Sequence, residues 1–391
     1  MSDVLEPGDI DELAGILKNC GAGRRAVELG GHFTKRAMGG EARGAEAVLS
    51  TRRLTRVVEY EPRDLTLGVE AGVGFQALEE LLGENGQMLP LDPPLAGKAT
   101  VGGVVAANCS GPRRRLYGSA RDLVIGMSFV TLEGQQVRSG GMVVKNVAGL
   151  DMAKLLIGSF GTLAAIARVN FRLHPRPPAS RTFALCCQAV KEAMGARDAI
   201  LRSALQPAAI DLANPAAATR LGGDSGRYML LVDAGGIDAV LARYERDLKA
   251  IARDSGAEVS ALDDEQARRT WRAVRDFPAL DGADDSSSAV VRISTRLARL
   301  DEAFELAGAL PALARAGSGI LYARCPDSGS DLAGRARAAG LQAVIESCSL
   351  AGKGGAELWA DPGPQLEVMR RIKRDLDPHN LLNHGRLFNR L

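Results

Sequence analysis

Four glycine-rich segments in the first half of the chain hold the residues best suited to bind an anionic ligand. In each segment Gly stands beside Ser, Thr, Asn, Lys or Arg, and the segments are Gly30–Lys35, Ala99–Asn108, Ser110–Arg113 and Gly158–Leu163. Glycine lets consecutive backbone N–H groups converge on phosphate oxygens, and hydroxyl side chains add further donors. Thr100 is placed to begin a helix whose N-terminus faces the same anion. Four such segments in one domain indicate a long, bent phosphate ligand such as a dinucleotide.

The same glycines could also serve turns without any ligand, or a nicotinamide cofactor. Glycine suits any turn that needs a positive φ, and composition alone leaves that possibility open beside phosphate binding. A nicotinamide-binding fold would place glycines at a strand-to-helix turn. Gly21–Ala26 fits its spacing but follows a predicted helix, and Gly72–Ala77 fits but leads to no second parallel strand ending in an acid. We therefore interpret the first as a chance match and the second as a plain strand-to-helix turn.

The elements that must position these segments fall into two halves. Asp9 followed by Glu12 predicts a capping box at the start of a helix, and the alternation from Leu65 to Ala71 predicts a strand with one buried face. The proline-rich run 174–178 is the best linker in the sequence. Beyond it, strands such as Phe183–Cys187 alternate with long helical segments rich in Ala, Arg and Leu, which predicts an α+β second domain.

Composition excludes several classes of protein. The 391 residues carry 49 Lys and Arg against 47 Asp and Glu, which gives a net charge of +2. A charge this close to zero does not indicate binding to nucleic acid or to an anionic membrane surface. No stretch approaches the roughly 20 apolar residues of a membrane span, and we expect no secretory signal. The six cysteines form no C-x-x-C pair, which argues against an iron–sulfur or zinc site of its own. We expect reduced thiols and a cytoplasmic location.

Several of these segments carry a family resemblance. They are Ala99–Gly103, Ser110–Arg113, Gly118–Asp122, Gly140–Gly141, Lys145–Gly149 and Gly158–Leu163. Together they resemble the flavin domain of the vanillyl-alcohol-oxidase-type, or PCMH-type, FAD oxidoreductases. Within that family the chain is most similar to the FAD-binding E subunit of bacterial glycolate oxidases, through Tyr60–Leu65, Gly86–Pro90 and Gly111–Arg115. The resemblance covers residues 9–178 well and the end of the chain moderately.

The resemblance implies an α+β fold in three parts: a two-subdomain PCMH-type FAD-binding domain (1–178), an α+β cap domain of ferredoxin-like βαβ units (179–360), and a C-terminal helix and tail that return to the flavin domain (361–391). FAD would lie between the two subdomains in extended form, with its pyrophosphate wrapped by the loop that begins at Gly30. The implied cofactor-binding residues are Gly30, Gly31, His32, Thr34, Lys35, Thr100, Gly102, Gly103, Ala106, Asn108, Ser110, Gly111, Asp122, Gly158, Gly161 and Thr162. No catalytic residue and no metal ligand is assigned.

The chain departs from the family pattern at three places. His32 and Phe33 bring side chains to a phosphate loop that is usually a run of glycines. In several relatives a Gly-Gly-His at this loop carries the flavin on the histidine, so a covalent FAD link through His32 is one hypothesis, and a surface or packing histidine is the other. Leu150 replaces an aromatic residue, and the tail reads Asn383-His384-Gly385 where the family has Asn-Pro-Gly.

The histidines bear on the role of the chain. Only four are present, and none lies between residues 175 and 378, where the cap of hydroxy-acid dehydrogenases in this family supplies metal ligands. The resemblance therefore implies the FAD-binding subunit of a glycolate oxidase complex, which oxidises glycolate, a 2-hydroxy acid, to glyoxylate. Its partners would be a flavin D subunit and an iron–sulfur F subunit, through which it could lie at the inner membrane. The alternatives are a stand-alone FAD-dependent dehydrogenase of the D-lactate type and a structural subunit that has lost tight FAD binding.

Overall fold

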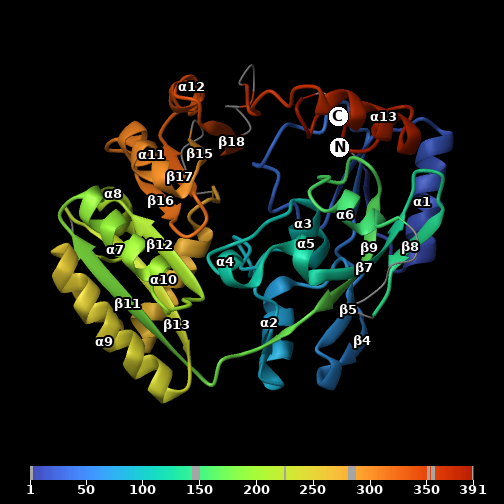
Figure 1. The fold of residues 1–391 in the computed structure, drawn as a ribbon. Coiled ribbons are helices and arrows are strands. Elements are labelled where there is room, and N and C mark those ends of the chain that lie inside the picture. The colour runs from blue at the N-terminus through green and yellow to red at the C-terminus, as the bar shows by residue number, and fades with distance from the viewer. Residues whose placement is uncertain are drawn as a thin grey trace. The chain divides into compact units, whose positions relative to one another are not determined.

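The chain forms two compact units in this computed structural model, which describes residues 3–142, 150–223, 226–280, 288–349, 353, 357–389 and 391 (Figure 1). The first unit comprises Met1–Ser110, Gly118–Arg176 and Asp361–Leu391, and the second comprises Gly111–Tyr117 and Pro177–Ala360. The motif expected at Lys145–Gly149 lies outside the described residues. The expected division into an FAD-binding domain, a cap domain and a C-terminal tail, with a role for each part, stays a prediction.

A five-stranded antiparallel sheet is the centre of the first unit. Its strands run in the order β4-β5-β9-β7-β8 and are β4 (Val57–Glu61), β5 (Thr66–Glu70), β7 (Val124–Val130), β8 (Gln136–Gly140) and β9 (Ala165–Arg172). One hydrophobic core joins this sheet to the helices α2 (Phe75–Glu84), α3 (Val101–Ala106), α5 (Ala120–Leu123) and α6 (Met152–Leu156). The expectation of a single buried face on β5 is wrong, because the whole strand is buried. Glu70 tolerates burial because it accepts hydrogen bonds from the backbone and side chain of Arg56, both at 2.9 Å.

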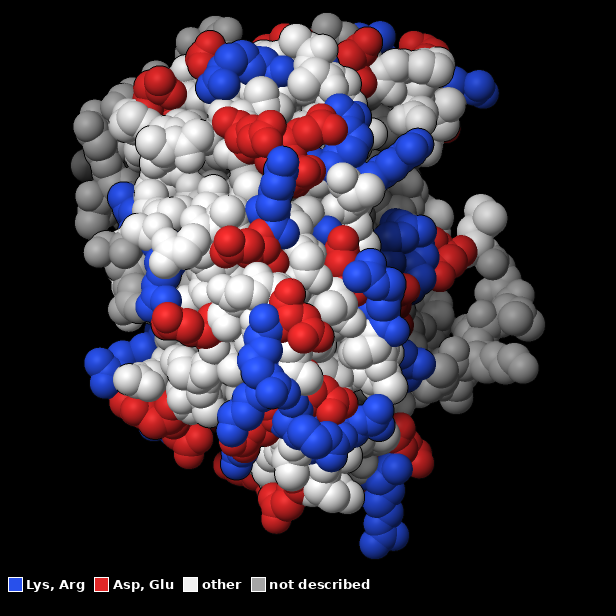
Figure 2. All heavy atoms as spheres, turned by 60° about the vertical axis from the view of Figure 1, so that its left-hand side comes forward, with Lys and Arg blue, Asp and Glu red and all other residues white. Residues whose placement is uncertain are grey.

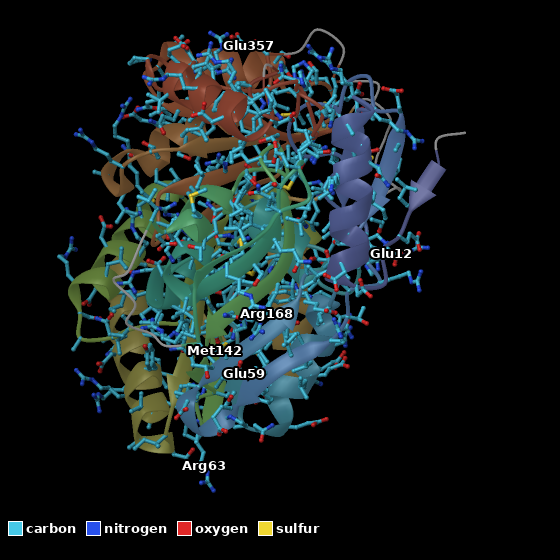
Figure 3. All side chains as sticks on the ribbon, turned by 90° about the vertical axis from the view of Figure 1, so that its right-hand side faces the viewer. Glu12, Glu59, Arg63, Met142, Arg168 and Glu357 are labelled. Carbon is cyan, nitrogen blue, oxygen red and sulfur yellow. The ribbon has the colours of Figure 1, made fainter. Side chains whose placement is uncertain are left out.

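On the outward face of this sheet, several polar side chains are linked to one another by hydrogen bonds. Arg168 donates from Nε to Asn170 at 2.9 Å and from Nη2 to Glu59 at 3.2 Å (Figure 3). A Cβ on Gly68 would lie 2.4 Å from the Arg168 guanidinium, so glycine makes room for the side chain to lie flat across the strands. Arg168 therefore links Asn170 of its own strand to Glu59 of β4.

A small parallel sheet and one helix complete the first unit. The sheet has the order β1-β3-β2, from β1 (Asp3–Leu5), β2 (Val27–Gly30) and β3 (Ala47–Ser50), and it shares a core with α1 (Ile10–Ala22). Asp9 caps α1 by accepting from Glu12 N at 2.8 Å. The predicted capping box is only half formed, because the Glu12 carboxylate accepts from Gly8 N at 2.7 Å. The proline-rich run is not a bare linker: β10 (His174–Pro175) pairs with β6 (Gln87–Met88).

The C-terminal tail belongs to this unit. It follows α13 (Gln365–Leu376), and Leu382 forms a parallel bridge with Val27 of β2. Val27 N donates to Leu381 O at 2.7 Å, and Asn383 N donates to Val27 O at 3.0 Å. The tail therefore extends the small sheet at its β2 edge.

The second unit is built on one eight-stranded antiparallel sheet, in the order β14-β11-β13-β12-β16-β17-β15-β18. The strands are β11 (Ala179–Cys187), β12 (Ala209–Ala213), β13 (Tyr228–Gly236), β14 (Glu258–Ala261), β15 (Ala289–Ser294), β16 (Ala312–Arg315), β17 (Ile320–Cys325) and β18 (Gln342–Cys348). One core buries the helices α7 (Val190–Arg202), α9 (Asp238–Ser255), α11 (Leu300–Ala307) and α12 (Ser330–Ala338) against one face of the sheet. A second core holds α8 (Pro215–Arg220) and α10 (Asp264–Asp276) on the other face.

The strand order reveals a repeat of a βαββαβ pattern. The run β11-α7-β12-β13-α9-β14 gives four strands in the order 4-1-3-2, and the run β15-α11-β16-β17-α12-β18 gives the same order. The two halves join where β12 pairs with β16. The ferredoxin-like units expected from the sequence are therefore present as two copies side by side in one sheet. The short helix α4 (Arg114–Tyr117) also packs in this unit, and a Cβ on Gly317 would lie 2.3 Å from Cδ of Arg115.

The exposed face around α9 carries both signs of charge. Arg181 pairs with Glu245 at 3.0 Å, Lys249 pairs with Glu245 at 2.7 Å, and Arg243 pairs with Asp247 at 3.2 Å. Figure 2 shows Lys and Arg interspersed with Asp and Glu over the face it presents. This mixture agrees with the near-balanced composition.

The joint between the two halves of the sheet depends on a buried ion pair. Asp211 and Arg315 lie opposite one another in register, 2.5 Å apart, with side chains 0% and 5% exposed. We expect Arg315→Leu to lower the free energy of unfolding by about 3–5 kcal/mol, because it removes the guanidinium that faces a fully buried carboxylate. Urea denaturation measures this. The double variant Asp211→Leu/Arg315→Leu should recover much of the loss, whereas Arg268→Leu, which breaks an exposed pair, should cost less than about 1 kcal/mol. An equal loss in Arg315→Leu and Arg268→Leu would contradict the assignment.

Candidate functional site

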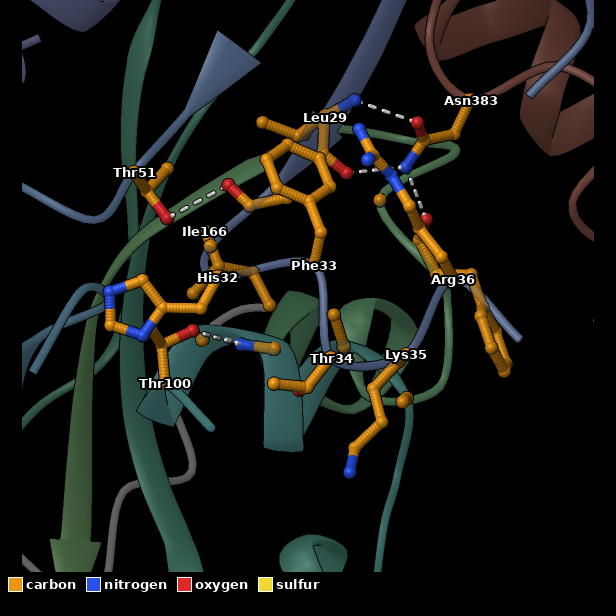
Figure 4. A pocket seen from close by; sticks show the side chains of 18 of the residues that line it. Leu29, His32, Phe33, Thr34, Lys35, Arg36, Thr51, Thr100, Ile166 and Asn383 are labelled. Atoms are coloured by element: carbon orange, nitrogen blue, oxygen red, sulfur yellow. Dashed lines mark hydrogen bonds between the residues drawn. The ribbon is translucent and has the colours of Figure 1, made fainter. Parts of the chain in front are cut away.

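The first unit contains a pocket formed by the turn after β2, the start of α3, the turn before β9 and the C-terminal tail (Figure 4). Many residues expected to bind a cofactor line it. They are Gly30, Gly31, His32, Thr34, Lys35, Thr100, Gly102, Gly103, Ala106 and Gly161. Segments far apart in the sequence therefore meet at one place.

The turn after β2 presents a row of free backbone donors. Across the described part of the chain, the amide N–H groups of Gly31, His32, Phe33 and Thr34 donate to no acceptor. The carbonyl side of the same turn is held by the protein: Gly30 O accepts from Thr51 N at 2.9 Å, and Gly31 O accepts from Ser50 Oγ at 2.9 Å. Consecutive free N–H groups in a turn form an anion-binding concavity.

The side chains of the turn are also fixed. His32 Nδ1 lies 3.1 Å from Lys98 O, which makes Nδ1 the donor nitrogen, and Lys35 Nζ donates to Pro94 O at 2.6 Å. Figure 4 shows His32, Phe33 and Lys35 leaving the turn in different directions. The turn is therefore anchored on both sides while its amides stay free.

The Phe33 side chain is held by two neighbours of the turn. Its ring folds back over Gly30, where a Cβ would lie 2.6 Å from the ring, and its backbone has a φ of 56°. The Arg36 guanidinium lies 4.3 Å from the ring centre, within cation–π distance. Arg36 in turn pairs with Glu28 at 2.7 Å. The Phe33 ring therefore packs between Gly30 and Arg36 at the edge of the pocket.

Helix α3 starts after Thr100 as expected, but its first N–H groups are not free donors. Val101 N donates to Val73 O at 2.9 Å, Gly102 N donates to Ala71 O at 2.8 Å, and Gly103 N donates to Thr100 Oγ1 at 3.3 Å. The idea that this helix N-terminus binds the anion is wrong, because its first amides are spent on the protein. The free amides beside α3 are those of Gly31–Thr34, in the turn after β2.

Some of the predicted site residues lie outside the pocket lining. Asn108 has a φ of 49°, a buried Oδ1 with no hydrogen-bond partner in the described structure, and a neighbour in Gly158, whose Cβ would lie 3.4 Å from that of Asn108. Asp122 accepts from the backbone and hydroxyl of Ser119 at 2.8 and 2.9 Å, and so caps α5. Thr162 donates to Ser159 O at 2.7 Å. Ser110 is the last residue of its segment of the first unit, and Gly111, the next residue, belongs to the second unit. Their roles in binding stay predictions.

The C-terminal tail brings to the pocket two residues that the sequence did not single out. Asn383 Oδ1 accepts from Leu29 N at 2.7 Å, and its Nδ2 donates to Leu29 O at 2.9 Å and to Phe160 O at 2.6 Å. Arg386 lines the pocket and is 8% exposed. The signal was the Asn383-His384-Gly385 motif, which marks the tail but not where it folds. His384 itself does not line the pocket, and burial lowers the pKa of its imidazole.

These features fit a ligand that carries phosphate groups. The free amides of the turn and the Lys35 ammonium are donors for phosphate oxygens. A Cβ on Gly31 would lie 2.1 Å from Thr100 Oγ1, so only glycine allows the turn and α3 to approach this closely. Apolar side chains such as Leu29, Ile166 and Ala164 supply the rest of the wall.

Comparison with known proteins defines the class. A family model described as "FAD binding domain" matches residues 2–140, and one described as "FAD linked oxidases, C-terminal domain" matches residues 176–304 and 360–387. The solved structure of p-cresol methylhydroxylase superposes on 98% of this chain and 88% of its own, with a TM-score of 0.77 and 14% identity, which shows the fold. The chain belongs to the FAD-linked oxidases with a PCMH-type FAD-binding domain. The expected fold class and FAD as the cofactor are thereby confirmed.

Three individual relatives are similar to parts of the chain or to nearly all of it. The chain is 42% identical to the glycolate oxidase subunit GlcE of Escherichia coli over 125 residues, 32% of this chain and 36% of the relative. It is 34% identical to the D-2-hydroxyglutarate dehydrogenase of Xanthomonas citri over 46% of this chain and 38% of the relative. It is 24% identical to the glycolate oxidase subunit GlcD of Bacillus subtilis over 98% of this chain and 88% of the relative. The chain thus aligns with little more than a third of the first two relatives.

The helices of the structure bear on membrane insertion. Among the residues described, no helix combines the length and apolar character that crossing a bilayer would need.

Gly31 and Gly74 offer a matched pair of substitutions. We expect Gly31→Ala to lower the amount of FAD that copurifies by at least about tenfold, because the new Cβ would force Thr100 and the turn apart. Gly74→Ala should leave FAD content unchanged, since nothing lies within 4 Å of its Cβ. The ratio of flavin to protein absorbance measures both. Normal FAD content in Gly31→Ala would contradict the close approach.

The partly buried His384 predicts a dependence of stability on pH. Its pKa is lowered from 6.5, first by burial and then by Lys373 and Arg43. Below about pH 6.5 the unfolded chain binds a proton that the folded chain binds only at lower pH, so stability falls as the pH falls. We expect His384→Gln to flatten this fall between about pH 6.5 and 5 in urea denaturation. The exposed His379, replaced by Gln, is the control and should leave the slope unchanged.

Proposed function

We propose that this chain is the FAD-binding subunit of a glycolate oxidase complex and holds FAD in extended form, with the pyrophosphate at the turn Gly31–Lys35. The observation that carries the proposal is the row of free amides beside Lys35, in a pocket of an FAD-binding domain. The similarity to the glycolate oxidase subunit of Escherichia coli supports the subunit role.

Different residues of the pocket bind different parts of FAD in this proposal. The amides of the turn and the ammonium of Lys35 bind the phosphates, and Thr34 adds a hydroxyl beside them. Gly102 allows α3 to pack on the end of β5, because its Cβ would lie 2.7 Å from Cβ of Ala71. The apolar wall excludes water from the bound group, which strengthens each polar contact. FAD, when bound, supplies the acceptor for the electrons of a CH–OH group.

Glycolate is the proposed substrate of the complex, with glyoxylate as the product. A partner D subunit would carry the site of hydroxy-acid oxidation, and an iron–sulfur F subunit would take the electrons, because this chain has no C-x-x-C pair to hold a cluster. Peripheral association with the inner membrane would come through these partners.

A second candidate is a stand-alone FAD-dependent dehydrogenase of a 2-hydroxy acid, of the D-lactate type. The similarity to D-2-hydroxyglutarate dehydrogenase favours it, since that relative is a dehydrogenase by name. Reduction of an artificial electron acceptor by the purified chain alone, with glycolate or D-lactate, would support this candidate over the subunit role.

The visible absorption spectrum of the purified chain tests the proposal. Oxidised-flavin bands are expected, and acid precipitation then separates two forms of attachment. Flavin in the supernatant means that the turn alone holds it. Flavin in the pellet supports a covalent link, for which His32 has only Nε2 free, since Nδ1 donates to Lys98 O. In that case His32→Gly should release the flavin, and His379→Gln should not. A colourless chain that takes up no added FAD would overturn the proposal and leave a structural subunit.

A further inference from the structure

Arg386 is a buried cation that reaches the pocket from the far end of the chain. It is 8% exposed and lines the pocket. Its Nη2 donates to Lys35 O at 2.8 Å, and its Nη1 donates to Arg36 O at 3.2 Å. Its guanidinium lies 5.5 Å from the centre of the Phe160 ring. The side chain is therefore held at the turn that presents the free amides.

This guanidinium lacks the anionic partner that Arg315 and Lys373 have. Arg315 pairs with Asp211 at 2.5 Å, and Lys373 pairs with Asp377 at 2.6 Å. In the part of the chain that the structure describes, no carboxylate lies within hydrogen-bonding reach of Arg386. Burial lowers its pKa to about 10, and the field of Glu28 does not offset this. A buried charge without a counter-charge is costly unless a ligand supplies one.

Lys35 repeats this situation in the same pocket. Its side chain is 9% exposed, and its ammonium donates to Pro94 O at 2.6 Å. Among the described residues it too has no carboxylate partner. Arg386 donates to the carbonyl of Lys35 itself, so both cations converge on one turn. Two unbalanced positive charges beside a row of free amides suit a ligand with two adjacent negative charges.

We propose that Arg386 supplies the second positive charge for the pyrophosphate of the bound dinucleotide, so that the C-terminal tail is a binding part of the cofactor site. This inference rests on the proposed FAD site. It assigns to Arg386 a ligand contact in addition to its two carbonyl contacts. A purely structural Arg386 would hold the tail on the turn and make no difference between ligands with and without phosphate.

Ligands with and without phosphate separate these two roles. Dissociation constants for FAD, ADP and riboflavin are measured by fluorescence quenching or calorimetry on the full chain, wild type and Arg386→Met. Loss of a charge-assisted contact should weaken FAD and ADP by about 10- to 100-fold and riboflavin by less than about twofold. The control is Arg371→Met, since Arg371 is exposed on α13 and makes no hydrogen bond or ion pair among the described residues. It should leave all three constants unchanged.

A second variant keeps the test decisive if Arg386→Met folds poorly. Arg386→Lys keeps the charge but cannot hold both carbonyls, and it should retain FAD and ADP binding within about fivefold. Equal weakening of FAD, ADP and riboflavin in either variant would overturn the inference and leave Arg386 a structural residue. Unchanged FAD and ADP binding in both variants would overturn it as well. A wild-type chain that binds neither FAD nor ADP would instead refute the proposed function.

Discussion

A buried ion pair between Lys373 and Asp377 holds the C-terminal tail against the turn before β9 in the first unit. The Lys373 ammonium donates to Asp377 at 2.6 Å, to Thr162 O at 2.6 Å and to Leu382 O at 3.0 Å. The Asp377 carboxylate accepts from Leu381 N and Leu382 N at 2.9 and 2.8 Å. Burial lowers the pKa of Lys373, while Asp377 opposes this shift. Because every group in the cluster is paired, the tail is fixed on the first unit and can present Asn383 and Arg386.

Strained backbone gathers where the tail meets the pocket. Phe33, Phe160 and Asn383 all have positive φ, at 56°, 53° and 45°, although none is glycine. Such conformations persist only where surrounding contacts over-determine them, and they concentrate at functional sites. Here the contacts are two guanidiniums over two aromatic rings and the three hydrogen bonds of the Asn383 amide. The pocket is therefore shaped before any ligand arrives, which reduces the ordering cost of binding.

The second unit is stabilised in a different way from the first. Its two βαββαβ halves bury separate helices on one continuous sheet, so most of its stability is distributed over apolar contacts. The pairing of β12 with β16, which joins the two halves, contains buried polar groups instead. Arg315 donates to Asp211 and, at 3.2 Å, to Val274 O. A buried pair of this kind adds little net stability but strongly penalises any other strand pairing, since misalignment would leave a charge alone. We infer that this residue pair sets the register of β12 on β16.

The sequence by itself determined the features that depend on local chemistry. The glycine turn after Leu29, the start of α3 after Thr100 and the family fold all follow from residue types in short segments. What only the tertiary structure decided are the partners of those segments. The first amides of α3 bond to Ala71 and Val73 instead of an anion, and Arg386 reaches Lys35 across most of the chain. No local pattern encodes such pairings, because a hydrogen-bond donor is satisfied by whichever acceptor long-range packing brings to it.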